Sequence, residues 1–223
     1  DIYMYTPSFY QKIIYLLLIT NWPQAVSYNI APYFVLWNVG QGQFLTRIDS
    51  FYCLHIDAGG ENYPRSLNID CISQQHRHWI SHWDYDHYSF VKDLKWKYQS
   101  VQTNLRQYTV YEGERGRKKN DSSKVIQIRN LLVSGDSLKR QEKLWLQRIR
   151  LPLDIYILGH HGSKTSNSDD LLNKISPYLK QCLNSARKQK YGHPHAVVTK
   201  RLEKHKCPLI GTQNWGHIRF RLR

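Results

Sequence analysis

The sequence predicts a domain of the α/β class that is rich in β-sheet. Apolar, β-branched and aromatic residues fill three successive short runs, residues 33–37, 44–48 and 51–56, which predict strands. Asp49-Ser50 supplies a two-residue hairpin turn between the last two runs. The chain has 223 residues, which is enough to bury a substantial core in a single unit.

The second half of the chain alternates strand patterns with helical ones. Further strands are predicted over residues 124–129, 131–134 and 154–158. Residues 137–150 carry apolar side chains at helical spacing, with Ser137 as the expected N-cap and Pro152 as the stop. A polar run, 167–170, predicts the start of another short helix that continues to Ile175.

The first 30 residues are expected to form a separate N-terminal segment or linker, with the folded domain over residues 31–223. Residues 13–19 are strongly apolar but shorter than the roughly 20 residues that span a membrane. They also lack the basic region and cleavage site of a signal peptide. Three interpretations remain open: a core helix, an interfacial helix, or the tail of a preceding membrane segment.

The charge of the chain predicts a polyanionic partner. It carries 32 Lys and Arg against 17 Asp and Glu, a formal net charge of +15. Such a surface attracts nucleic acid and, less often, acidic lipid headgroups. Seven Trp and 16 Tyr add rings that can stack on unpaired bases. The alternative is a basic protein whose positive charge has no role in binding a polyanion.

The cysteine pattern excludes little. Because no two of the four cysteines form a Cys-x-x-Cys pair, a zinc knuckle is not expected. An even number permits disulfides without establishing them. Cys53 lies in an apolar alternating run, and we expect it to be a buried thiol.

The densest group of chemically reactive side chains is the run His82-x-Asp84-x-Asp86-His87. It follows an apolar stretch, 78–80, so alternate side chains of an extended or looped backbone can converge. Imidazole and carboxylate groups are ligands of Zn²⁺, Mn²⁺ and iron. The alternative is a polar loop with incidental histidines.

Two later strand ends add candidate ligands. Asp136 follows the apolar run 131–133 through Ser-Gly, a sequence that is also common at a simple strand-to-turn junction. His160-His161-Gly162-Ser163 ends the strand predicted over 154–158 and favours a role in binding metal or phosphate.

The charged stretch 112–121 contains four basic side chains, Arg115, Arg117, Lys118 and Lys119. It is either an exposed loop or an arm that contacts phosphate near the site.

Taken in order, these motifs resemble the metallo-β-lactamase superfamily and, within it, the hydrolase domain of the ComEC family of DNA-uptake proteins. The resemblance runs from about residue 33 to the C-terminus. It rests on the stretches 38–43, 55–60, 82–87, 134–136, 159–163 and 190–195. The family usually opens with Asp-Val-Gly-Gln-Gly-Asp, whereas this chain has Asn38 and Gln43 at the two acidic positions. This departure predicts reduced activity.

The resemblance implies a four-layer αββα fold with a site for two divalent ions, Mn²⁺ or Zn²⁺, at one edge of the facing sheets. The implied metal ligands are His82, Asp84, Asp86, His87, Asp136 and His160. Asp136 would bridge the ions, and Asp84, where many relatives have His, favours Mn²⁺. The implied catalytic residues are Asp86, His161 and His193. Asp57 would orient the metal loop by hydrogen bonding. The implied substrate-binding residues are Ser163, Gln41, Lys190 and His195.

The implied activity is that of a metal-dependent phosphodiesterase or nuclease. It would act on DNA, most simply on single strands and without regard to sequence. It would degrade or handle the non-transported strand at the extracellular or periplasmic face of the cytoplasmic membrane, joined to a membrane-spanning portion of the same protein. Two alternatives stay open: a small-molecule hydrolase such as a lactonase or thioesterase, and a catalytically weakened DNA-binding module. Metal identity, cleavage polarity and oligomeric state are left open.

Overall fold

The computed structural model describes residues 31–114 and 119–222, and the chain from Ala31 onward forms one compact unit. The apolar run predicted over residues 13–19 lies outside the described residues. Within them, no helix is both long and apolar enough to cross a membrane.

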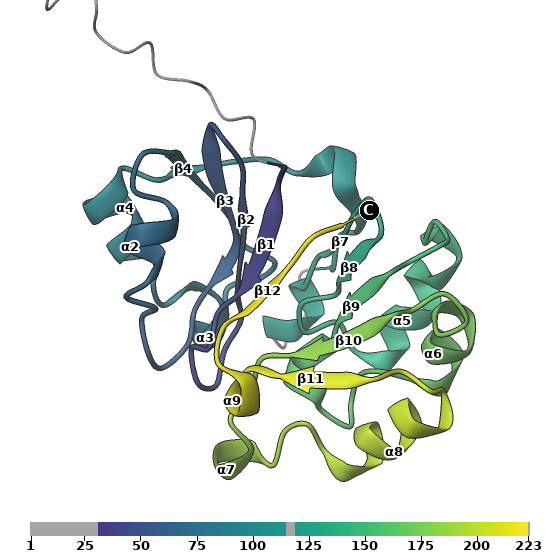
Figure 1. Ribbon diagram of the computed structural model, residues 1–223. Helices are drawn as coiled ribbons and strands as arrows, with labels where there is room; N and C mark the ends of the chain where they lie inside the picture. The colour runs from purple at the N-terminus through teal and green to yellow at the C-terminus, as the bar shows by residue number, and fades with distance from the viewer. Residues whose placement is uncertain (1–30, 115–118, 223) are drawn as a thin grey trace, which may run out of the picture. The chain divides into compact units, whose positions relative to one another are not determined.

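Two six-stranded sheets make up the framework of this unit (Figure 1). In the first sheet, antiparallel pairing joins β12 to β1, β1 to β2 and β2 to β3, and parallel pairing joins β3 to β4 and β4 to β5. Its strands, in spatial order, are β12 (Ile218–Phe220), β1 (Tyr33–Leu36), β2 (Phe44–Ile48), β3 (Tyr52–Ala58), β4 (Gln75–Trp79) and β5 (Val101–Gln102).

The second sheet has the same mixture of pairings. Strands β8 to β11 run parallel to one another, whereas β6, β7 and β8 are joined by antiparallel pairing. In spatial order the strands are β11 (Leu209–Gly211), β10 (Gln181–Asn184), β9 (Ile155–Ile157), β8 (Leu131–Val133), β7 (Val125–Ile128) and β6 (Thr109–Tyr111).

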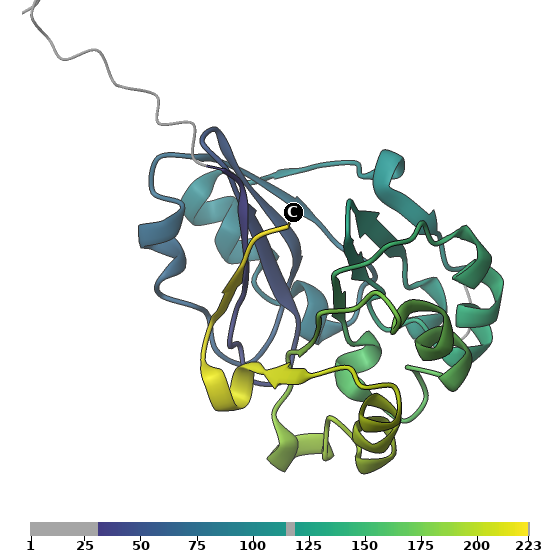
Figure 2. The same cartoon turned by 45° about the vertical axis from the view of Figure 1, so that its right-hand side comes forward.

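Helices cover the outer face of each sheet, so the unit has four layers in the order αββα (Figures 1 and 2). The first sheet carries α2 and α4, and the second carries α5, α6 and α8. The α-helices are α2 (Leu67–Asp70), α3 (Tyr85–Tyr88), α4 (Val91–Tyr98), α5 (Lys139–Trp145), α6 (Asp169–Ile175), α7 (Lys188–Tyr191), α8 (Ala196–Lys204) and α9 (Thr212–Trp215). The 3₁₀-helices are η1 (Arg106–Tyr108), η2 (Lys119–Ser122), η3 (Leu146–Arg148) and η4 (Gly159–Gly162). The predicted fold class is therefore confirmed.

The four layers follow from strands that are apolar on both faces. Successive side chains of a strand point to opposite faces. In β9, Ile155 and Ile157 enter the core between the sheets, whereas Tyr156 enters the core beneath the second sheet's helices. In β1, Phe34 faces the other sheet, and Val35 faces the helices of its own sheet. Such strands are stable only when both faces are covered.

The helix predicted over residues 137–150 begins later and ends earlier than expected. Its N-cap is Leu138 rather than Ser137, and it changes to a 3₁₀ turn at Leu146. The Ser137 hydroxyl instead accepts a hydrogen bond from Nε1 of the buried Trp145, at 2.8 Å. The prediction of Ser137 as a cap was wrong because tertiary packing uses its oxygen. The predicted cap of α6 is confirmed, since Ser168 Oγ accepts from Leu171 N.

The cysteines form two disulfides, Cys53–Cys71 and Cys182–Cys207. Cys53 is buried as predicted, but the expectation that it is a free thiol was wrong. The first disulfide ties β3 to the end of α2, and the second ties β10 to the segment after α8. Each therefore links a central or flanking strand to the helical layer that covers it.

A series of buried side-chain hydrogen bonds runs across the first sheet. Trp37 Nε1 donates to Thr46 Oγ1 at 2.7 Å, and Thr46 lies 3.0 Å from His55 Nδ1. His55 Nε2 lies 3.0 Å from His76 Nδ1, and His76 Nε2 lies 3.0 Å from the carbonyl of Cys71. Since that carbonyl only accepts, both imidazoles are satisfied when each is neutral and each donates in the same direction.

The two buried histidines of this series, His55 and His76, predict that the folded protein loses stability in acid. Burial and the neighbouring His76 and His78 lower the pKa of His55 well below its ordinary value, and burial also lowers the pKa of His76. In the unfolded chain both rings take up protons near pH 6.5, so the free energy of unfolding falls as pH drops below that value. Each such histidine contributes about 1.4 kcal/mol per pH unit. We expect urea unfolding to show this slope between pH 7.5 and pH 5, and His55→Gln to flatten it. An unchanged slope in the variant would mean that other groups control the acid sensitivity.

Candidate metal centre

The carboxyl ends of parallel strands from both sheets meet at one edge of the unit and carry the predicted ligands. His82 follows β4, Asp136 follows β8, and His160 and His161 follow β9. In α/β sheets this edge is the usual place for a binding site. The backbone of the metal loop is packed tightly there: a Cβ on Gly59 would lie 2.4 Å from Asp86 C and His87 N.

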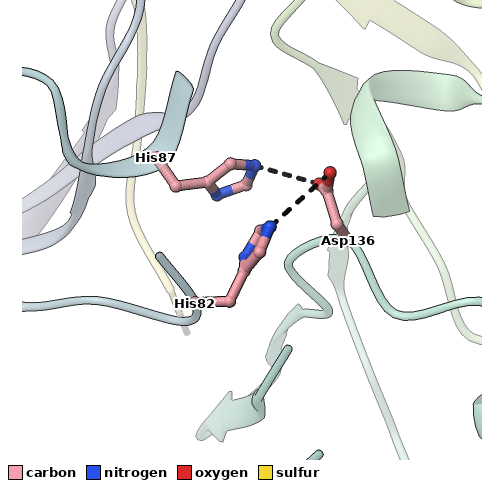
Figure 3. A group of neighbouring side chains, drawn as sticks. All are labelled: His82, His87 and Asp136. Carbon is pink, nitrogen blue, oxygen red and sulfur yellow. Dashed lines mark ion pairs between the residues drawn. The ribbon is translucent and has the colours of Figure 1, made fainter. Parts of the chain in front are cut away.

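Four buried atoms at this edge face one another and have no hydrogen-bond partner among the described residues: His82 Nε2, His87 Nε2, His161 Nε2 and Asp136 Oδ1. The Asp136 carboxylate lies 3.0 Å from His87 Nε2 and 3.8 Å from His82 Nε2 (Figure 3). It also lies 3.8 Å from His161 Nε2. Unpaired buried polar atoms are rare. Imidazole nitrogen and carboxylate oxygen together suit a divalent cation, so the residues fit a metal ion.

The ligand atoms form two overlapping groups, each compact enough to hold one ion. One group is His82, His87 and Asp136, and the other is Asp86, His87 and His161. Asp86 Oδ2 lies 3.1 Å from His161 Nε2. Of the six ligands implied by the sequence, four lie in these groups, whereas Asp84 and His160 do not.

Asp57 holds the metal loop from behind. This fully buried carboxylate accepts hydrogen bonds from Ser81 N at 2.7 Å, Ser81 Oγ at 2.9 Å and Gln43 Nε2 at 3.0 Å. Its Oδ2 also lies 2.8 Å from His87 Nδ1. Donation from that nitrogen fixes the ring so that His87 Nε2 faces Asp136. This is the arrangement by which a carboxylate orients a metal-binding histidine.

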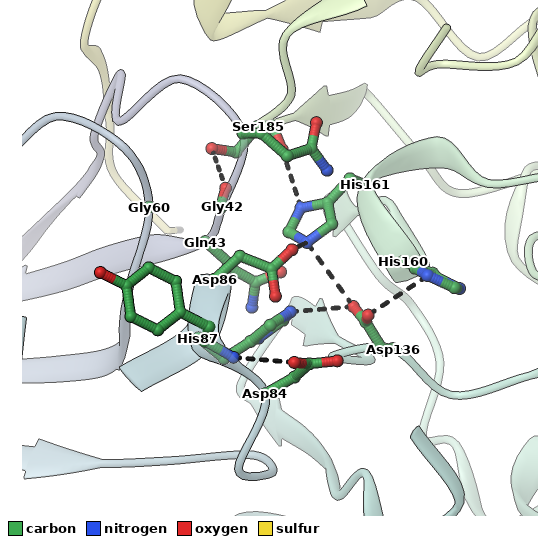
Figure 4. A network of polar contacts seen from close by, with 12 residues as sticks. Gly42, Gln43, Gly60, Asp84, Asp86, His87, Asp136, His160, His161 and Ser185 are labelled. Carbon is green, nitrogen blue, oxygen red and sulfur yellow. Dashed lines mark hydrogen bonds and ion pairs between the residues drawn. The ribbon is translucent and has the colours of Figure 1, made fainter. Parts of the chain in front are cut away.

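His161 is held in the same way, by a backbone carbonyl. Its Nδ1 donates to the Ser185 carbonyl at 2.9 Å, and its Nε2 faces Asp86 and Asp136 (Figure 4). His160 and His161 both have left-handed backbone angles, φ 49° and 53°. The His161 ring is buried, whereas the His160 ring is partly exposed and its Nε2 lies 3.4 Å from Asp136 Oδ2. The geometry favours His161 over His160 as the ligand, the reverse of the preference implied by the resemblance.

Asp84 belongs to neither ligand group. Its Oδ1 accepts from Tyr85 N at 2.8 Å, which caps α3, and from Lys119 Nζ at 3.0 Å. The neighbouring Asn120 Nδ2 lies 3.3 Å from both Asp136 Oδ2 and His160 Nε2. Of the basic loop predicted over residues 112–121, Lys119 therefore reaches the site, and residues 115–118 lie outside the described part. No sequence pattern pointed to Asn120 as a site residue.

The histidines and carboxylates of the cluster shift one another's pKa values. Burial opposes ionisation of His87, but Asp136 and Asp57 outweigh it and raise its pKa well above the ordinary value. Burial also opposes ionisation of Asp136, yet His87 and His161 hold its pKa well below the usual range. The pKa of Asp86 falls to about 2, against burial, because of His161. Burial and His87 lower the pKa of His82 to about 4, so this ring is neutral and its lone pair is available.

A cleft of about 400 Å³ opens over the ligand groups. Five predicted substrate-binding or catalytic residues line it: Gln41, Asp86, His161, Lys190 and His193. Glu61, Tyr85 and Tyr191 also line it, and the sequence analysis did not single them out.

Two predicted substrate-binding residues are not part of the cleft lining. Ser163 Oγ contacts Thr165 Oγ1 at 2.9 Å, and the His195 side chain caps α8 by accepting from Val197 N. Their assigned role in binding substrate stays a prediction.

The two departures from the family's acidic positions also lie off the cleft. Gln43 is buried and donates to Asp57, so a neutral amide occupies that position beside an existing carboxylate. Asn38 contacts His217 through its backbone, with Asn38 N donating to His217 Nδ1 at 2.9 Å. Neither residue contributes an atom to the ligand groups. The reduced activity predicted from them stays a prediction.

In sequence, the chain is similar to three competence and recombination proteins. It is 31% identical to Recombination protein 2 of Haemophilus influenzae over 90 residues, 30% to ComE operon protein 3 of Bacillus subtilis over 108, and 34% to Competence protein ComA of Neisseria gonorrhoeae over 94. The matches cover 40%, 46% and 41% of this chain but 11%, 14% and 14% of the relatives. No family model matches the chain.

In structure, the chain is similar to metallo-β-lactamase fold proteins. It matches YhfI of Bacillus subtilis with a TM-score of 0.53 over 81% of this chain and 96% of the other, at 10% identity. It matches a diphosphatase of the PhnP family with a TM-score of 0.52 over 86% and 98%, also at 10% identity. Together these findings confirm both parts of the resemblance seen in the motifs: the metallo-β-lactamase fold and the ComEC-type competence proteins.

Proposed function

From a chain that has the metallo-β-lactamase fold and is similar to competence proteins, we propose a metal-dependent phosphodiesterase that cleaves DNA. The observation that carries the proposal is the set of four buried, unpaired ligand atoms on His82, His87, His161 and Asp136. They converge at the strand ends, beneath an open cleft. Two divalent ions, Mn²⁺ or Zn²⁺, would lower the pKa of a water and neutralise charge on the phosphate oxygens.

The chain's own residues set the geometry for that chemistry. Asp57 and the Ser185 carbonyl orient the rings of His87 and His161 so that Nε2 of each faces the centre. Burial, together with His161 and His160, lowers the pKa of His193 to about 4. His193 is therefore neutral at pH 7 and can donate one hydrogen bond to a phosphate oxygen or to the leaving group.

The charge at the mouth of the cleft supports an anionic substrate. Arg187 and Lys190 both lie within 3.0 Å of Glu61 at the rim, so two cations face one carboxylate. The net charge of +15 extends this attraction over the chain as a whole. Small lactones and thioesters need no such surface.

The proposed setting is the outer face of the cytoplasmic membrane, as one domain of a longer DNA-uptake protein with a membrane-spanning portion. Two disulfides support an oxidising compartment, because such bonds are rare in the cytosol. The matched part covers only 11–14% of the competence proteins, which supports a larger whole. In that setting the domain would degrade or handle the strand that is not transported.

The test is a cleavage assay with a metal series. Linear single- and double-stranded DNA are incubated with metal-free protein reloaded with Mn²⁺, Zn²⁺ or Mg²⁺, with EDTA as the blank. We expect cleavage of single strands that depends on Mn²⁺ or Zn²⁺ and not on sequence. We also expect binding to weaken with salt by about −0.7 in the log–log slope per phosphate contacted.

Two outcomes would overturn the proposal in favour of the alternatives. Salt-dependent binding of single strands without cleavage in any metal would identify a DNA-binding module. Hydrolysis of a lactone or thioester, together with DNA binding that does not respond to salt, would identify a small-molecule hydrolase.

A further inference from the structure

Two tyrosine rings stand exposed in the cleft that holds the ligand groups. Tyr85 is 67% exposed and Tyr191 is 58% exposed, and both line the cleft with Asp86, Asp136 and His193. An exposed tyrosine presents a flat apolar face and a polar tip, a combination that is enriched at binding interfaces. A phosphate group alone would be held by charges and hydrogen bonds and would need neither ring.

The two rings come from different sheets. Tyr85 opens α3 in the metal loop after β4, a strand of the first sheet. Tyr191 ends α7, which follows β10 of the second sheet. Because the cleft lies where the carboxyl ends of both sheets meet, each sheet contributes one ring to its lining.

Each ring is supported at its side rather than covered on its face. Tyr85 meets Tyr88 edge to face, with ring centroids 6.1 Å apart at an angle of 75°. Tyr191 lies beside His193, with centroids 6.1 Å apart, and Lys190 Nζ lies 5.3 Å from its centroid. Among the described residues, no hydrogen bond involves either phenol oxygen, so neither ring is tied to the protein through its polar end.

The helix that carries Tyr191 is fixed to the opposite part of the site by ion pairs. Lys190 Nζ lies 2.9 Å and Arg187 Nη2 lies 3.0 Å from Glu61 Oε1, and Glu61 follows β3 of the first sheet. Glu61 also accepts from Gln41 N at 2.9 Å. Tyr191 is therefore held at the rim beside two cations, which is where the backbone of a nucleic acid strand would lie.

We propose that Tyr85 and Tyr191 form a stacking subsite for unpaired nucleobases on the two sides of the cleaved phosphate. This inference rests on the proposed phosphodiesterase function and specifies its substrate as a base-bearing single strand or a frayed end. Paired bases are already stacked on their neighbours and present no free face to either ring. Stacking on an aromatic ring is tolerant of sequence, because every base has a π-face.

The experiment compares two strands of equal length: oligothymidine, and a strand of abasic sites with the same sugar-phosphate backbone. Wild-type protein loaded with Mn²⁺ should cleave oligothymidine with the higher kcat/KM. Tyr85→Leu and Tyr191→Leu should each reduce the ratio of the two kcat/KM values about five- to a hundredfold, the range for one base–aromatic stack. Tyr85→Phe and Tyr191→Phe keep the ring and should keep the ratio.

Tyr178→Leu is the matched control, because this tyrosine is also exposed, at 47%, but does not line the cleft. The ratio should be unchanged in that variant. Equal cleavage of both strands by the wild type, or an unchanged ratio in both leucine variants, would overturn the stacking subsite while leaving the phosphodiesterase in place. Failure of the wild type to cleave either strand in any metal would instead overturn the proposed function, and the subsite with it.

Discussion

Replacing Asp86 with alanine is expected to abolish turnover while leaving the fold intact. Asp86 Oδ2 lies 3.1 Å from His161 Nε2, and its side chain is 28% exposed, in a short helix of the metal loop. Loss of this carboxylate removes one ligand from one of the two groups but opens little cavity in the core. We expect kcat/KM on single-stranded DNA to fall on the order of 10³-fold. The free energy of unfolding should fall by about 2 kcal/mol or less, the size of the Asp86 pKa shift at neutral pH.

Elemental analysis separates loss of metal from loss of chemistry. Protein reloaded with Mn²⁺ or Zn²⁺ should hold about two ions per chain, and Asp86→Ala should hold about one. Asp93→Ala is the control, since Asp93 is an exposed carboxylate on α4 that pairs with Lys97 at 3.9 Å. It should change neither the metal content nor the rate. Full activity in Asp86→Ala would be incompatible with a two-ion centre built on this residue.

Removal of either disulfide is expected to cost about 3 kcal/mol of stability. Cys53–Cys71 closes a span of 18 residues, and Cys182–Cys207 closes one of 25. Because the entropy of loop closure depends only on the logarithm of loop length, the two losses should be similar. Alanine replaces both cysteines of each pair, since these sites are buried and a serine hydroxyl would be left unpaired. Urea unfolding measures the change.

Reduction provides the internal control for this prediction. Dithiothreitol should lower the urea midpoint of the wild type, lower that of each single-disulfide protein by less, and leave the variant without cysteines unchanged. A wild-type midpoint that does not move under reducing conditions would show that the two bridges contribute nothing to stability.

Much of the fold was predictable because strand patterns in the first sheet are local. The run 44–48 matches β2, and the hairpin through Asp49-Ser50 joins it to β3. The strand predicted over residues 51–56 ends two residues later than expected, because β3 continues to Ala58. Short strands made by distant pairing, such as β12 against β1, carry too few residues for a pattern. Their existence depends on a partner 180 or so positions away, which no local window detects.

For the site as well, the sequence indicated the types of the ligands but not their arrangement in space. The family resemblance implied that His82, Asp86, His87 and Asp136 belong to one set, and all four lie in the two ligand groups because loops at strand ends meet at a common edge. The sequence could not decide between His160 and a neighbour with nearly the same backbone angles. That choice depends on which ring finds a carbonyl acceptor, and the acceptor lies 24 residues away.

Asp84 illustrates a second limit of sequence reasoning. As the first residue before a short helix it has a local use for its carboxylate, the cap of α3. A pattern of alternating ligands does not reveal this competition. The cation that also binds the Asp84 carboxylate, Lys119, comes from a segment 35 residues further along the chain.

The series of buried hydrogen bonds that starts at Trp37 offers a marker for opening of the whole first sheet. The indole proton of Trp37 is shared with Thr46, which lies against His55, and all three side chains are fully buried. That proton can exchange with deuterium only when water reaches it, which requires the first sheet to separate from its covering helices. Its exchange rate in an NMR experiment would therefore measure the free energy of global opening directly.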